Sequence, residues 1–239
     1  MSAERKVVIV TGASQGIGAG ILDAFRQRNH LVVATSRSIG PRDDPSVLTV
    51  QGDVGAPETA EKVINAAMER FGRVDTLVNN AGMFMAKPFA AYSRGDYDTY
   101  ISTNVTGFFC MTQRALELMG KQGRGHVVTI TTSLVDQPMS SVPAALASLT
   151  KGALSAATKA LAIEYAASGV RVNAVSPGII KTPMHPPEAH RALAALHPMR
   201  RMGEISDIVD AVLYLDDAGF VTGEVLHVDG GQAAGHHAL

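Results

Sequence analysis

The chain has 239 residues, of which 46% are hydrophobic and 18% are charged, and 21 basic and 22 acidic side chains give a net charge of −1. This length suffices for one large α/β domain with a full core, so we expect residues 1–239 to form a single domain. The near-neutral balance does not favour nucleic acid or an anionic membrane surface as a partner. No apolar run is long enough to span a bilayer and no signal-peptide pattern opens the chain, so we expect a cytoplasmic protein.

The first predicted strand, residues 6–10, leads directly into a glycine-rich turn that reads TGASQGIG over residues 11–18. Helical spacing follows, with Ile21 and Phe25 on one side. Backbone N–H groups at a helix start point outward and the helix dipole favours negative charge, so this turn can hold a phosphate. The alternative is a tight strand–helix turn without a ligand. The candidate cofactor-binding residues here are Gly12, Ser14, Gln15, Gly16, Ile17 and Gly18.

The second predicted strand, residues 31–35, is followed by Ser36 and Arg37. An acidic residue at this strand end would bind the ribose 2′-hydroxyl of NAD and repel the 2′-phosphate of NADP. Arg37 instead offers a planar guanidinium that matches a phosphate. We therefore predict NADP(H), with NAD(H) as the alternative cofactor and Arg42 as a second candidate contact. A solvated surface charge is the other interpretation of Arg37.

The rest of the chain alternates strand-like and helix-like stretches. The predicted strands continue at residues 47–51, 76–78, 126–131, 170–175 and 224–228, and the predicted helices span residues 57–71, 93–119 (one helix or two), 143–167 and 204–215. This alternation predicts an α/β fold with right-handed crossovers. We expect a doubly wound, mostly parallel seven-stranded sheet of the Rossmann type, with helices on both faces.

One long segment, residues 177–203, breaks this alternation and contains five prolines. Ligands of such sheets bind outside the carboxyl ends of the strands, where this segment begins. We therefore predict a lid-like segment that covers a substrate, and the alternative is a disordered surface loop.

Short motifs follow several of the predicted strands, one after another along the chain. Gly52-Asp53-Val54 follows the third strand, Asn79-Asn80-Ala81-Gly82 the fourth and Ser176-Pro177-Gly178 the sixth, and VDGG ends the last strand. With the TGxxxGxG turn, this series resembles the short-chain dehydrogenase/reductase family along nearly the whole chain. The resemblance implies further cofactor contacts at Asp53, Val54, Asn80, Ala81, Gly82, Pro177, Gly178 and Ile180.

The same resemblance implies a catalytic set of Asn, Ser, Tyr and Lys. Asn104 matches the Asn, and Lys151 matches the Lys, which also binds the cofactor ribose in this family. Strand register places Thr132 at the Ser position, whereas Ser133 matches by residue type and is slightly favoured. The tyrosine should precede Lys151 by four residues, but that position holds Ala147 and no tyrosine lies within the same turn.

A methyl group at Ala147 cannot transfer a proton, and loss of a general acid typically costs ~10²–10⁴ in rate. Lys151 could donate through a water, or Ser133 could orient a water, and the sequence does not decide between them. His185, His190 and His197 in the lid-like segment are candidates for substrate contact or proton relay. We expect no metal site, because Pro186 and Pro187 interrupt regular ligand spacing.

We predict an oxidoreductase acting on a small carbonyl or alcohol substrate with an altered proton-transfer step. The alternatives are a catalytically weak cofactor-binding sensor or structural partner, and a non-redox lyase or isomerase on the same scaffold. The resemblance also implies a homo-oligomer, most simply a tetramer, with residues 93–119 and 143–167 as the contact surface. The low fraction of charged residues agrees with such an assembly.

Overall fold

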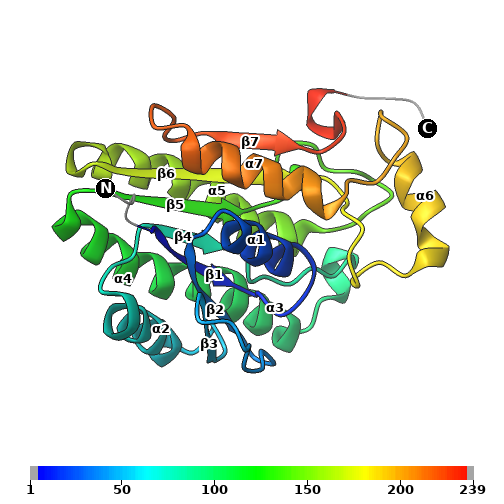
Figure 1. The fold of residues 1–239 in the computed structure, drawn as a ribbon. Coiled ribbons are helices and arrows are strands. Elements are labelled where there is room, and N and C mark those ends of the chain that lie inside the picture. The colour runs from blue at the N-terminus through cyan, green and yellow to red at the C-terminus, as the bar shows by residue number, and fades with distance from the viewer. Residues whose placement is uncertain (1–4, 236–239) are drawn as a thin grey trace.

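The computed structural model describes residues 5–235, which fold around one seven-stranded sheet (Figure 1). The strand order is β3-β2-β1-β4-β5-β6-β7, and every neighbouring pair is parallel. The strands are β1 (Val7–Thr11), β2 (Leu31–Ser36), β3 (Val47–Gln51), β4 (Thr76–Asn79), β5 (Gly125–Ile130), β6 (Val170–Pro177) and β7 (Val225–Val228). The order reverses direction at β1, so the predicted doubly wound Rossmann-type fold is confirmed.

Helices cover both faces of the sheet, and each face has its own apolar core. Strand β1 shows the division, because Val8 and Val10 pack on one face whereas Val7 and Ile9 pack on the other. The first face is covered by α1 (Gly16–Gln27) and α7 (Ile205–Asp217), and the second by α2 (Pro57–Phe71), α4 (Gly107–Gln122) and α5 (Ala145–Tyr165). Full burial of each large aliphatic side chain contributes roughly 1.5–3 kcal/mol, so these two cores hold the sheet rigid.

The predicted helical region 93–119 is continuous but irregular. It consists of α3 (Arg94–Tyr100), a π-helical segment (Ile101–Thr106) and α4. Ser93 and Asp96 form a reciprocal capping box that starts α3. Short π-helical segments are rare and concentrate at functional sites, and this one contains Asn104.

The lid-like segment 177–203 is less irregular than predicted. A 3₁₀ turn at Pro187–Ala189 leads into a short helix, α6 (His190–Ala195), which lies beyond the carboxyl edge of the sheet in Figure 1. The prolines suggested a loop, but Pro186 and Pro187 precede the helix, where proline is tolerated. Ile180 bridges to Gly203, so the two ends of the segment are fastened together.

None of the helices within residues 5–235 combines the length and the apolar character that crossing a membrane requires.

Candidate active site at the carboxyl edge of the sheet

A cavity of about 640 Å³ opens at the carboxyl edge of the sheet, a volume typical of small-molecule sites. Its wall is built by the turns after the first six strands and by the lid-like segment. The sequence-predicted residues that line it are Gly12, Ser14, Gln15, Gly16, Ile17, Ser36, Arg37, Asp53, Val54, Asn80, Ala81, Gly82, Thr132, Ser133, Lys151, Pro177, Gly178 and Ile180. Gly18 of the predicted cofactor set and Asn104 of the predicted catalytic set do not line the cavity.

Glycine is required where the first turn packs on the segment after β4. Gly12 has a φ of 65°, and a Cβ there would lie 2.9 Å from the Cα of Ala81. A Cβ on Gly18 would lie 2.3 Å from the carbonyl oxygen of Gly12 and 2.5 Å from Nδ2 of Asn80. That amide in turn donates to the Thr11 carbonyl at 2.9 Å. Gly18 therefore closes the turn from behind, although it does not reach the cavity.

The amino end of α1 is built to receive an anion. The N-cap residue Gln15 makes no side-chain cap hydrogen bond, and the first turn carries no acidic residue. The N-cap side chain therefore leaves the first backbone N–H groups of the helix uncapped, and the helix dipole adds positive character there. This open cradle fits the pyrophosphate of a dinucleotide.

The end of β2 supplies a cationic side chain to the same cavity. Arg37 is exposed and lines the cavity, while Oγ of Ser36 accepts from the Ser38 backbone N–H at 3.3 Å. The structure does not bring Arg42 to the cavity, because its guanidinium donates to Asp23 at 2.8 Å on the surface. Of the two arginines, Arg37 is therefore the one that lines the cavity.

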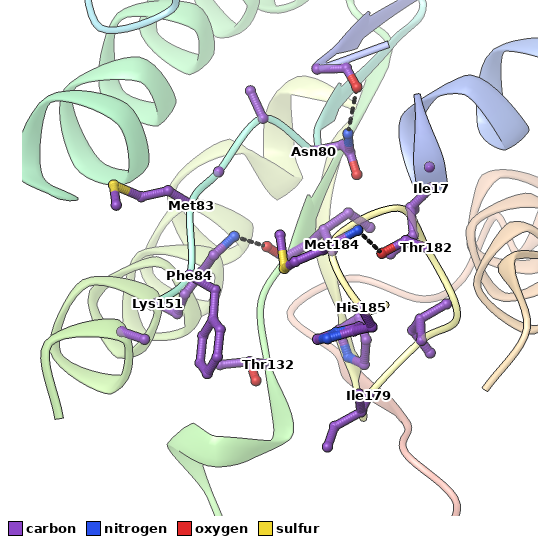
Figure 2. Close-up of a pocket in the computed structure, with 18 of the residues that line it drawn as sticks. Ile17, Asn80, Met83, Phe84, Thr132, Lys151, Ile179, Thr182, Met184 and His185 are labelled. Atoms are coloured by element: carbon purple, nitrogen blue, oxygen red, sulfur yellow. Dashed lines mark hydrogen bonds between the residues drawn. The ribbon is translucent and has the colours of Figure 1, made fainter. Parts of the chain in front are cut away.

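Lys151 is the buried cation of the cavity. Its side chain rises from α5, and Nζ donates to the carbonyl oxygen of Ile130 at 2.6 Å (Figure 2). Burial disfavours the charged form and lowers the pKa of Lys151 to about 8. A Cβ on Gly82 would lie 2.9 Å from this Nζ, so a glycine at that position leaves room for the ammonium group.

Asn104 supports the cavity from behind. Its Oδ1 accepts from the Met83 backbone N–H at 2.9 Å, and its Nδ2 donates to the Met83 carbonyl at 3.3 Å and to Thr150 Oγ1 at 3.1 Å. The amide is therefore held by protein groups. It fixes the start of the segment after β4.

The two candidate hydroxyls after β5 differ in where their protons go. Ser133 donates to Oε1 of Gln232 at 2.8 Å, so its proton is committed within the protein. Oγ1 of Thr132 accepts from the Leu134 backbone N–H at 3.4 Å, and its own proton meets no acceptor within residues 5–235. The geometry thus leaves Thr132 free to donate into the cavity, in contrast to the slight preference for Ser133. Sequence reasoning missed Gln232, whose only signal was its place directly after the VDGG turn.

Ala147 lies one turn before Lys151 on α5 and lines the cavity. No tyrosine lies among the described residues that line the cavity. Tyr100 belongs to the same buried apolar cluster as Ala147. Its hydroxyl donates to the Met85 carbonyl at 3.1 Å and accepts from the Met85 N–H at 2.6 Å, and burial raises the pKa of Tyr100 to about 12. Tyr100 is thus a buried structural residue.

Of the lid histidines, only His185 lines the cavity. Burial and the neighbouring His190 lower the pKa of His185, so its neutral form is favoured. His197 is buried, and its Nε2 accepts from the Ile179 backbone N–H at 3.0 Å, which fastens the lid-like segment. Residues 5–235 contain no group of three or more metal-ligating side chains placed to hold an ion.

Comparisons with known proteins agree with this geometry. A family model described as "Enoyl-(Acyl carrier protein) reductase" matches residues 12–233. The chain is 34% identical to the 3-oxoacyl-[acyl-carrier-protein] reductase FabG of Vibrio cholerae, covering 97% of this chain and 98% of that protein. It is 35% identical to 3beta-hydroxysteroid dehydrogenase 1 of Eggerthella lenta, covering 95% and 93%. The solved structure "ElxO with NADP Bound" superposes with a TM-score of 0.91 at 30% identity, covering 97% and 100%.

Proposed function

The chain belongs to the short-chain dehydrogenase/reductase family and is an oxidoreductase of that type, and we propose that it uses NADP(H) to interconvert a small carbonyl compound and its alcohol. The observation that carries this proposal is a single cavity that is lined by the glycine-rich turn before α1 and also by Lys151 and Thr132. NAD(H) remains the alternative cofactor.

The cofactor half of the cavity is formed by the turns after β1 to β4. The open start of α1 would hold the pyrophosphate, and Arg37 would hold the 2′-phosphate that distinguishes NADP(H). Asp53 would meet the adenine side, with its Oδ1 already fixed by the Gly55 N–H at 2.9 Å. When bound, the nicotinamide supplies a hydride to a carbonyl carbon or accepts one from an alcohol carbon.

The proton step in this protein falls to Lys151, because the methyl group of Ala147 cannot transfer a proton. Thr132 would hold the substrate oxygen by donating its free hydroxyl proton. The Lys151 ammonium then delivers a proton to that oxygen during reduction, directly or through a water, and neutral Lys151 takes it back during alcohol oxidation. A pKa of about 8 suits this exchange near neutral pH.

A panel of simple ketones assayed with NADPH and with NADH, beside direct cofactor titrations, tests the proposal. We expect reduction with NADPH at a rate that falls as the pH rises through about 8, because the acid is lost there. At saturating NADPH, Lys151→Met should abolish this pH dependence, and Thr132→Val should slow reduction more than Ser133→Ala does. Tight NADPH binding without turnover of any ketone would contradict the proposed enzymatic activity and favour the alternative of a cofactor-binding sensor.

The proposal also includes a role for the lid-like segment and an oligomeric state. Residues 177–203 would cover the substrate, since Met184 and His185 line the cavity. The expected tetramer would form through α4 and α5, whose exposed apolar side chains include Phe109, Leu149 and Ile163. A monomeric mass by light scattering at micromolar concentration would contradict it. A single domain and a cytoplasmic location stay predictions from the sequence.

A further inference from the structure

The segment after β4 is fixed on both sides of Phe84. On one side the Met83 N–H donates to Oδ1 of Asn104 at 2.9 Å. On the other side the Met85 N–H donates to the hydroxyl of the fully buried Tyr100 at 2.6 Å. The backbone at Phe84 is therefore held by two buried residues, and its side chain is presented in a defined direction.

The side chain of Phe84 faces the cavity. Phe84 is half-buried, lines the cavity and packs against the buried cluster that contains Tyr100, Leu134 and Ala147. Figure 2 shows its ring pointing toward Thr132, the residue with the free hydroxyl. The ring thus forms part of the wall next to the place where a substrate oxygen would be held.

The space beside Ala147 is filled by protein. Although Ala147 lines the cavity, its exposed fraction is only 1%. Four cavity-lining side chains pack against its cluster, namely Met83, Phe84, Met139 and Val142. Phe84 is the largest of the four and the only ring. Apolar side chains therefore pack around Ala147, at the position where the family resemblance implies a phenol.

The substrate half of the cavity also has little charge. Among the described lining residues, the aspartate, lysine and arginine side chains are Arg37, Asp53 and Lys151. The first two belong to the turns after β2 and β3. Lys151 is the residue assigned to the substrate oxygen in the proposed proton step. Among the described lining residues Arg37 is the only arginine, and it belongs to the cofactor half of the cavity. The thioethers of Met83, Met139 and Met184 are suited to contacts with flat rings.

We propose that Phe84 is the specificity-determining residue of the site and packs opposite Ala147. Its ring selects an uncharged carbonyl substrate that carries an aromatic or similarly flat apolar group. This inference rests on the proposed function, because it names the substrate class of the same site. The substrate's ring stacks on or against the edge of Phe84, while its carbonyl oxygen is held by Thr132.

Ligand binding tests the proposal without requiring turnover. Acetophenone and its charged analogue 4-acetylbenzoate are titrated by calorimetry into the full chain, with and without NADP⁺. We expect acetophenone to bind at least about tenfold more tightly, because the analogue's carboxylate would lose its water in an apolar part of the cavity. Phe84→Ala should weaken acetophenone binding about tenfold through loss of the ring contact. The matched control is Phe89→Ala, because Phe89 is 68% exposed and lies outside the cavity lining.

A second pair of variants tests the packing itself. Ala147→Tyr alone should lower the melting temperature, because the new ring meets Phe84, and Phe84→Ala in the same chain should restore it. The proposal is overturned if Ala147→Tyr is tolerated equally well with and without Phe84. It is also overturned if neither probe binds, if both probes bind alike, or if the two phenylalanine variants behave alike. Failure of NADPH to bind the wild-type chain would instead overturn the cofactor assignment, and the calorimetric comparison would still decide on Phe84.

Discussion

Polar groups at the two edges of the sheet differ in whether they are paired within the protein. At the amino edge, where the strands begin, buried polar side chains satisfy one another. At the carboxyl edge, the turns leave backbone N–H groups, a guanidinium and a hydroxyl facing a cavity. Both edges belong to one sheet, so the difference comes from the side chains and turns that the fold places at each edge.

The amino edge is centred on Asp216, whose side chain is 1% exposed. It accepts from Lys6 at 2.8 Å, from Thr76 at 2.7 Å and from Nδ1 of His126 at 3.3 Å. Burial alone would raise the pKa of Asp216, but these donors hold it well below its usual range. Burial lowers the pKa of His126 to about 4, and its Nε2 accepts from Asn173 at 3.1 Å, so the ring is neutral in the folded protein.

The contrast shows which polar groups stabilise the fold and which are available to a ligand. A buried polar group with complete partners contributes to folding, and its loss leaves other groups unpaired. A polar group aimed into a cavity without such partners is available for chemistry. We therefore expect variants at the amino edge to change stability and not cofactor binding, and variants at the carboxyl edge to change binding.

The largest expected effect is at the amino edge. Asp216→Ala removes the shared acceptor of Lys6, Thr76 and His126, and should destabilise the fold by about 3 kcal/mol. Urea unfolding measures this change. NADPH affinity of the folded variant should match that of the wild type, and a large loss of affinity would show that the two edges are not independent.

Acidic pH should lower the stability of the fold through the buried His126 at the amino edge. The folded-state pKa of His126, about 4, lies below the value near 6.5 of an unfolded histidine, so the unfolded chain binds the proton first. The stability that this residue supports is complete above about pH 6.5 and falls as the pH drops toward 4. Between pH 7 and pH 5 the loss should be about 2 kcal/mol. His126→Gln should flatten this part of the profile, and an equally steep profile in that variant would exclude His126 as the cause.

A substitution behind the cradle should affect the carboxyl edge. Gly18→Ala places a methyl group against the Gly12 carbonyl and the Asn80 amide, and should cost roughly 1–3 kcal/mol while displacing the phosphate-binding turn. NADPH titration and thermal unfolding should both report a loss. The matched control is Gly120→Ala, since a Cβ on that helical residue meets nothing within 4 Å and alanine favours a helix. Equal effects of the two substitutions would contradict the proposed cradle.

Local signals made much of the fold predictable. The third strand and the 57–71 helix were predicted at their observed bounds, because β-branched runs, Pro57 and Gly72 mark them. Proline misled in the lid-like segment, where a helix follows Pro187. The motifs also located much of the cofactor half of the cavity, since each follows a strand end.

Contacts between distant parts of the chain could not be predicted in this way. Ser133 and Gln232 are 99 residues apart in sequence, and their hydrogen bond decides which hydroxyl remains free. The place of Phe84 depends on Tyr100 and on packing against Ala147, neither of which leaves a local pattern. Asp216 lies 210 residues from Lys6, so the amino edge gave no sequence signal at all.

The most direct test of the cofactor site at the carboxyl edge is a titration of the wild-type chain and of Arg37→Ala with NADPH and NADH. We predict that the wild type binds NADPH more tightly than NADH, and that Arg37→Ala weakens NADPH binding about tenfold while NADH binding stays nearly unchanged, because only NADPH carries the 2′-phosphate. Equal losses for both cofactors, or no binding of either by the wild type, would contradict the account.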